Sequence, residues 1–262
     1  MQGQVTRVPS YGRYRRGMLV AAALIPDTAL LVEGAAGRAD PVAGLRRAAL
    51  SAIAQVVDAR PDVVVVVAPG LADRIVGGTV AGSLSAAGIP DALLGRPPRE
   101  FTLQDDTRDA AQPGVAAAVA LHLLDQVGTD AALRVVEVTP APGAVALARL
   151  GGSLTDGDGR TGLVVVGSGS GRHGPDAPLA DDDRAPAYDA AVLADLADAG
   201  PEAQARMSAA DPALATALAV RGWAPWQVLL GAAGDRPVQG RLLADEVVLG
   251  AQHAVLVWTV PA

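Results

Sequence analysis

The sequence predicts a three-layer α/β fold in which helices flank a central, mixed but mostly parallel sheet. Short runs of β-branched residues, such as Val63–Val67 and Leu163–Val166, show no polar alternation, as expected for strands buried on both faces. Stretches with apolar residues at helical spacing separate these runs, and this succession builds parallel strands joined by right-handed crossovers. The 262 residues contain no evident linker or internal repeat, so we expect one domain over residues 18–262.

Residues 1–17 are expected to form a disordered basic tail ahead of this domain. Three arginines between positions 13 and 16 precede the apolar run Met18–Ile25, an arrangement that superficially resembles a secretory or twin-arginine signal. The run is short, ends at Pro26-Asp27 and is not followed directly by a small-x-small cleavage site, so we interpret it as the first strand. No stretch is long enough to span a membrane, and we expect a cytoplasmic protein.

The first half of the domain is expected to alternate strands and helices. A helix over Pro41–Ala59 has apolar residues at helical spacing, with Asp40 as its expected N-cap and Pro41 at the first helical position. After the valine strand, residues 71–113 are rich in glycine and proline and are expected to form a long, loop-rich excursion. A helix over Gly114–Val127 and a strand over Arg134–Val138 then follow.

The second half continues this alternation on either side of the strand Leu163–Val166, which we expect to be central. Glycine and aspartate residues predict a turn over Gly151–Gly162. The other elements expected here are helices over Ala144–Leu150, Tyr188–Ala199, Pro201–Met207, Pro212–Arg221 and Gln227–Ala233, and strands over Glu246–Leu249 and Ala254–Val260.

The stretch Gly162–Arg184, GLVVVGSGSGRHGPDAPLADDDR, combines the central strand with a glycine-rich loop, His173 and an acidic cluster. A loop at the carboxyl end of a central strand is where α/β proteins usually place a site, whereas a plain surface crossover is the alternative interpretation. Residues 169–174 fit GxGxxG, but prolines follow instead of the helix that a dinucleotide site needs. Ser168 and Ser170 do not lie in a G-x-S-x-G elbow, so we interpret them as turn residues.

Three polar residues are candidates for a common site at the carboxyl edge of the sheet. Asp27 ends the first strand, His173 lies in the glycine loop and His253 begins the last strand, whereas His122 is expected to be a core or interface residue. One carboxylate and two histidines would suit Fe(II) or another divalent ion. The alternative, that these are separate polar loop residues, stays open.

Composition excludes several function classes. A net charge of −7 argues against a nucleic-acid-binding surface. The absence of cysteine excludes disulfides, thiolate chemistry and cysteine-ligated zinc or iron–sulfur centres.

Six stretches together resemble the class III extradiol ring-cleavage dioxygenases of the LigB type, a fold shared with the Memo-like proteins, and more closely a group of small actinobacterial LigB-like proteins. The similarity covers about residues 18–262. The stretches are MLVAAALIP, VVVVVAPG, GLVVVGSGSGRHG, APAYDAAVLADL, APWQVLLGAAG and GAQHAVLVWTV.

The resemblance implies an iron site that this chain only partly retains. Active members bind Fe(II) through a histidine after the first strand, a histidine after the next strand and a glutamate near the last strand, and a further histidine in the glycine loop acts as base. Here Asp27 occupies the first position, no histidine lies around Pro69-Gly70, and Gln252-His253 stand near the expected glutamate. His173 falls close to the position of the catalytic base.

The function expected from this resemblance is that of a LigB-like protein that has lost the usual Fe(II) ligands and binds a small molecule without cleaving a ring. The alternative is a divergent metal-dependent oxygenase or hydrolase for an aromatic or cyclic substrate, with Asp27 and His253 as metal ligands and His173 as general base. Whether any metal binds is left open. An alanine-rich surface that is sparse in charge also makes a homo-oligomer plausible.

Overall fold

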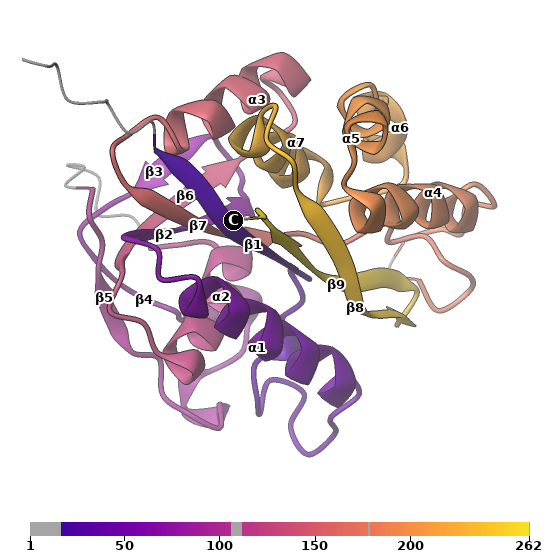
Figure 1. Cartoon of the computed structure of the whole chain (residues 1–262). Coiled ribbons are helices and arrows are strands. Elements are labelled where there is room, and N and C mark those ends of the chain that lie inside the picture. Colours follow the sequence, from indigo (N-terminus) through magenta and orange to yellow (C-terminus); the bar gives the residue numbers. More distant parts are fainter. Residues whose placement is uncertain (1–16, 106–111, 178, 262) are drawn as a thin grey trace, which may run out of the picture.

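A seven-stranded mixed sheet forms the centre of the computed structural model, which describes residues 17–105, 112–177 and 179–261 (Figure 1). Its spatial order is β3-β6-β2-β7-β1-β9-β8, so the strand predicted to be central is the middle one. Strands β6, β2, β7 and β1 pair in parallel, and β3, β9 and β8 pair antiparallel with their neighbours. The strands are β1 (Met18–Ile25), β2 (Val63–Pro69), β3 (Arg74–Val76), β6 (Ala132–Val138), β7 (Arg160–Val166), β8 (Gln239–Val248) and β9 (Ala251–Thr259).

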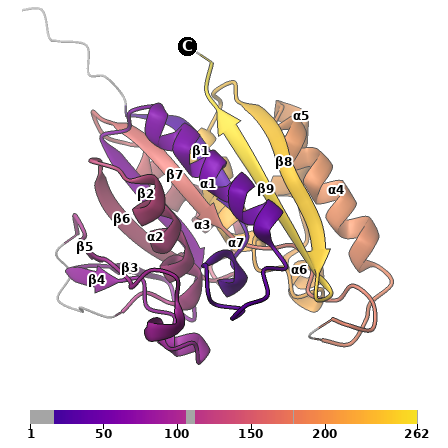
Figure 2. The same cartoon turned by 90° about the horizontal axis from the view of Figure 1, so that it is seen from below.

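Helices cover both faces of this sheet, which confirms the predicted three-layer α/β fold. In Figure 1, α1 and α2 lie below the sheet, and α3 and α7 lie above it with α4, α5 and α6 to their right; Figure 2 shows α1 and α2 on the near face. The helices are α1 (Ala43–Asp58), α2 (Val115–Val127), α3 (Gly143–Leu154), α4 (Ala185–Asp198), α5 (Pro201–Ser208), α6 (Pro212–Ala217) and α7 (Trp223–Ala233), with 3₁₀ turns η1 (Ala29–Leu31), η2 (Ser85–Ala87) and η3 (Asp91–Leu93).

The valine strand shows why the central strands lack polar alternation. Side chains alternate between the two faces of a strand. Val64 and Val66 enter the core under α1 and α2, whereas Val65 and Val67 enter the core under α3, α4 and α7. Since both faces of β2 are covered, every one of these positions must be apolar.

The expected N-cap of the first helix is wrong. Helix α1 begins at Ala43, and Asp40 lies outside it without capping it. Both Asp40 carboxylate oxygens instead accept hydrogen bonds from the Arg46 guanidinium, at 2.7 and 2.8 Å. The same guanidinium donates to the carbonyls of Leu30 and Leu31. Asp40 therefore stabilises the connection between β1 and α1 and does not cap the helix.

The turn expected over Gly151–Gly162 is also partly wrong, because α3 continues to Leu154 and β7 already begins at Arg160. A Cβ at Gly151 would lie 1.9 Å from the Val228 carbonyl oxygen, and a Cβ at Gly231 would lie 1.9 Å from that of Ala148. These glycines therefore let the backbones of α3 and α7 approach each other, and they do not mark a turn.

Other boundaries shift as well, most of all in β8, which begins at Gln239, seven residues before the expected Glu246. Helix α6 ends at Ala217 instead of Arg221, whereas α7 begins four residues earlier than expected, at Trp223. The excursion after β2 contains β3 and a separate two-stranded sheet of β4 (Thr79–Ala81) and β5 (Glu100–Thr102). The expected basic tail, except Gly17, lies outside the described residues. Among the described helices, none has the length and apolar character needed to cross a membrane.

Candidate functional site

A cavity of about 500 Å³ lies at the carboxyl edge of the four parallel strands. Its lining takes Asp27 from the end of β1, Pro69 and Gly70 from β2, Val138 from β6, and Ser168 from the end of β7. Parallel strands bring their carboxyl ends to one edge, which is why segments more than a hundred residues apart meet here. Much of the remaining wall is apolar and comes from Pro140, Leu179, Ala219, Val220, Ala224 and Ala251.

Ser168 joins two of the polar groups in this cavity. Its Oγ lies 2.9 Å from His253 Nδ1 and accepts a hydrogen bond of 3.3 Å from the backbone N–H of Asp27. Ser168 Oγ can donate its own proton to His253 Nδ1 while it accepts from Asp27, and in that tautomer the imidazole proton lies on Nε2. No hydrogen bond joins Nε2 to another described residue, so this nitrogen is available to a ligand.

The Asp27 carboxylate does not face the cavity alone. Arg221, on the connection between α6 and α7, forms an ion pair with it through Nε. The Asp27 side chain is 9% exposed and that of Arg221 is 57% exposed, so the guanidinium closes over the carboxylate from the solvent side. Because the Asp27 carboxylate is nearly buried, loss of this partner would leave it without a counter-charge and would cost free energy.

The imidazole of His253 is held in its neutral form. Burial lowers its pKa below the ordinary value, and the nearby negative charge of Asp27 opposes this only in part. The residue is 6% exposed. A neutral imidazole at physiological pH can donate a hydrogen bond to a ligand or coordinate a metal ion.

A second polar network lies behind the glycine loop and contains His173. Its Nε2 is 2.6 Å from the Asp189 carboxylate of α4, and the Ser170 backbone N–H donates to both oxygens of that carboxylate, at 3.0 and 3.2 Å. Burial raises the pKa of Asp189, while its bonds to His173 and Ser170 act in the opposite direction. A Cβ at Gly169 would lie 2.5 Å from Asp189 Oδ1, so the loop needs glycine at this position.

The three predicted site residues are therefore distributed over two networks. Asp27 and His253 line the same cavity, as expected, but His173 is not among the residues that line it. In the described part of the chain no group of three or more His, Cys, Asp or Glu side chains is placed to hold a metal ion. These residues do not form a three-ligand iron set, and the assignment of Asp27 and His253 as ligands stays a prediction.

Three polar residues of these networks were missed from the sequence. Ser168 was interpreted as a turn residue, and Arg221 and Asp189 were assigned to helices without a role. The sequence does not distinguish Asp189 from Asp195 and Asp198 of the same helix, and only the structure shows that Asp189 is buried, at 3% exposed. His122 fits its expected place in the core: it is 6% exposed, and burial lowers its pKa.

Comparison with known proteins adds little to this geometry. No protein-family model matches the chain, and no curated protein matches it. Among solved structures, it is similar to uncharacterized protein JW3007 from Escherichia coli K12, with a TM-score of 0.49 and 14% identity over 92% of this chain and 99% of that one. A likeness at this level carries no weight for function, and the fold assignment rests on the sheet itself.

Proposed function

We propose that this chain is a small-molecule-binding relative of the LigB-type dioxygenases without their usual iron ligands, and that its ligand occupies the cavity at the carboxyl edge of the sheet. The observation that carries the proposal is the convergence of Asp27, Ser168 and His253 on one mostly apolar cavity of about 500 Å³. A largely apolar cavity with a few oriented polar groups is typical of sites for small organic ligands.

The polar groups favour an aromatic or cyclic ligand that carries a hydroxyl or carboxyl group. In the tautomer in which Ser168 donates to Nδ1, the Nε2–H of His253 can donate to such an oxygen. Arg221 bonds Asp27 through Nε, so its exposed Nη atoms can donate to a ligand carboxylate while the ion pair is kept. The apolar wall then contacts the ring.

A metal-dependent enzyme is the second candidate, and it draws support from the shared position of Asp27 and His253 in this cavity. Two donors leave most of a coordination sphere to water or substrate, and Asp27 would first have to release Arg221. We therefore assign no catalytic step to a metal.

Binding is tested with 3,4-dihydroxybenzoate as probe, followed by ligand-observed NMR. Thr216 lines the cavity from an exposed position on α6, so Thr216→Trp should fill the cavity and abolish binding without unfolding the protein. Ala217→Trp is the matched control, because Ala217 is exposed on the same helix but does not line the cavity. Equal binding by the two variants would place the ligand elsewhere, and no binding to the unmodified protein would remove the proposal for this ligand class.

Metal analysis separates the two candidates. Protein purified without chelator and loaded anaerobically with Fe(II) is expected to retain no stoichiometric iron. Near-stoichiometric iron that is lost in Asp27→Ala but kept in Asp58→Ala, a change in an exposed carboxylate at the end of α1 that does not line the cavity, would replace the binding protein with the metal-dependent enzyme.

A further inference from the structure

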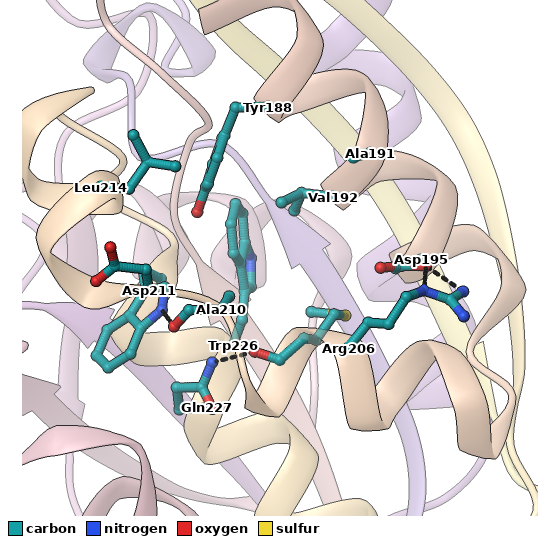
Figure 3. Close-up of a pocket in the computed structure, with 12 residues that line it drawn as sticks. Tyr188, Ala191, Val192, Asp195, Arg206, Ala210, Asp211, Leu214, Trp226 and Gln227 are labelled. Atoms are coloured by element: carbon teal, nitrogen blue, oxygen red, sulfur yellow. Dashed lines mark hydrogen bonds and ion pairs between the residues drawn. The ribbon is translucent and has the colours of Figure 1, made fainter. Parts of the chain in front are cut away.

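A second cavity, of about 240 Å³, lies among helices α4, α5, α6 and α7 (Figure 3). Its wall is largely aromatic and aliphatic, with Tyr188 and Val192 from α4, Leu214 from α6, and Trp223 and Trp226 from α7. The whole chain has one phenylalanine, three tyrosines and three tryptophans, so this cavity gathers an unusual share of its aromatic rings.

The hydroxyl of Tyr188 is left without a partner at this cavity. Its Oη is completely buried and forms no hydrogen bond with any described residue. Figure 3 shows it pointing into the space between Leu214, Asp211 and Trp226. A buried hydroxyl without a hydrogen bond destabilises the folded state, and such a group is commonly satisfied by a ligand or a bound water.

The charges around the cavity leave a negative excess. Arg206 pairs with Asp195 through Nε and Nη2, at 2.9 and 2.5 Å, and neutralises that carboxylate. Asp211 accepts only the backbone N–H of Ala213 at the start of α6, and no described cation pairs with it. Burial together with the negative charges of Asp189 and Asp211 raises the pKa of Tyr188 to about 12, which is consistent with a negative potential at the hydroxyl.

We propose that this cavity binds a small organic primary ammonium ion. Its positive charge faces Asp211 and the rings of Tyr188 and Trp226, and one N–H donates to Tyr188 Oη. The apolar part of the ligand contacts Val192 and Leu214. Because Tyr188 Oη is fully buried without a ligand, the proposed hydrogen bond requires a shift of the neighbouring Leu214 side chain. This site is separate from the cavity at the sheet edge and does not depend on the function proposed for it.

The dimensions limit the ligand to a small one. Sites for drug-sized molecules measure roughly 300 to 1,000 Å³, and this cavity is smaller. An ammonium group on a single ring or a short alkyl chain is of suitable size. A neutral molecule of the same shape would contact the rings equally well but would leave Asp211 without a counter-charge.

The test uses benzylammonium and benzyl alcohol, which share a shape and differ in charge. The indole N–H signals of the three tryptophans report binding in ¹⁵N-labelled protein and are assigned with single Trp→Phe variants. Benzylammonium should shift the signals of Trp223 and Trp226 saturably, while that of Trp258, whose Nε1 donates to Leu196 in the core, should stay fixed. Benzyl alcohol should bind at least about tenfold more weakly.

Three variants locate the contacts. Tyr188→Phe keeps the ring and removes only the hydroxyl, and it should weaken benzylammonium binding about fivefold while raising the midpoint of thermal unfolding. Asp211→Asn keeps an N-cap side chain and removes the charge, and it should weaken binding about tenfold. Glu202→Gln removes an equal charge from the exposed first turn of α5, outside the cavity, and should leave binding within about twofold.

Several results would overturn the assignment. Equal affinity for benzyl alcohol and benzylammonium would show that charge plays no part and would exclude an ammonium site. Unchanged affinity in both Tyr188→Phe and Asp211→Asn would exclude the proposed contacts. Loss of binding in Thr216→Trp with these two variants unaffected would move the ligand to the sheet-edge cavity, and absence of saturable shifts would remove the site altogether.

Discussion

The two cavities differ in whether their polar groups already have partners. At the sheet edge, Ser168 bonds His253 and Arg221 pairs with Asp27, so the polar groups are largely paired without a ligand. Between helices α4 to α7, the Tyr188 hydroxyl is buried and has no partner among the described residues. A ligand at the sheet edge must compete with contacts within the protein, whereas a ligand among the helices supplies a contact that the protein lacks.

The difference between paired and unpaired buried groups should appear in the free energy of unfolding, which can be measured without any ligand. Removing a member of a satisfied buried network leaves other groups unpaired and costs free energy, while removing an unpartnered buried group relieves the folded state. Two neighbouring residues of α4 represent the two cases, since Asp189 belongs to the His173 network and Tyr188 lines the helical cavity.

The largest effect is expected for Asp189→Ala. It removes the acceptor of the Ser170 N–H and the partner of His173, both in the interior, and should lower the free energy of unfolding by about 3 kcal/mol. Urea unfolding followed by circular dichroism measures the change. Asp189→Asn retains one acceptor oxygen and should lose less. A loss below about 1 kcal/mol in Asp189→Ala would show that the network is not satisfied in the way described.

A smaller effect of opposite sign is expected for Tyr188→Phe. The variant removes a buried hydroxyl that has no hydrogen bond, so the free energy of unfolding should rise by about 1 kcal/mol. The same urea experiment measures it. A decrease would mean that the hydroxyl has a partner in solution, and the contrast between the two cavities would then disappear.

The smallest effect is expected on acidification, because it concerns one proton at His253. Its folded-state pKa is lowered by burial, so between that pKa and the unfolded value of about 6.5 the unfolded chain binds more protons than the folded one. This contribution to stability is therefore complete above about pH 6.5 and is lost as the pH falls below it.

Histidine ring NMR checks this directly, with the His253 signal identified by its absence in His253→Gln. The ring should stay neutral at pH values where a free imidazole is mostly charged, and the same holds for His122, whose pKa burial also lowers. A His253 ring that titrates at or above its ordinary pKa would show that water reaches the imidazole in the sheet-edge cavity and that burial does not lower its pKa.

The sheet could be predicted because its strands are specified locally. Val63–Val67 and Leu163–Val166 are apolar at every position, and their burial on both faces follows from that pattern alone. The meeting of Asp27 with the glycine loop follows from the parallel arrangement, which brings the carboxyl ends of β1 and β7 to the same edge.

The remainder depended on partners that are distant in the sequence. Gly151 indicates a turn in the sequence, yet it lies where α7 packs against α3, because close approach of two helices also requires glycine. His173 was expected to face Asp27, yet its partner is Asp189, on a helix whose rotation about its axis the sequence does not specify. The helical cavity was missed because Tyr188 and Trp226 belong to different helices whose packing sets their distance.

Helix α4 carries Tyr188 and Asp189 at successive positions, which lie roughly 100° apart around a helix of 3.6 residues per turn. The helix thus directs the Tyr188 ring toward the cavity among helices α4 to α7, and the Asp189 carboxylate toward the glycine loop that borders the sheet-edge cavity. A rotation of α4 about its axis would displace both side chains together, the Tyr188 ring from the cavity among the helices and the Asp189 carboxylate from the backbone N–H of Ser170.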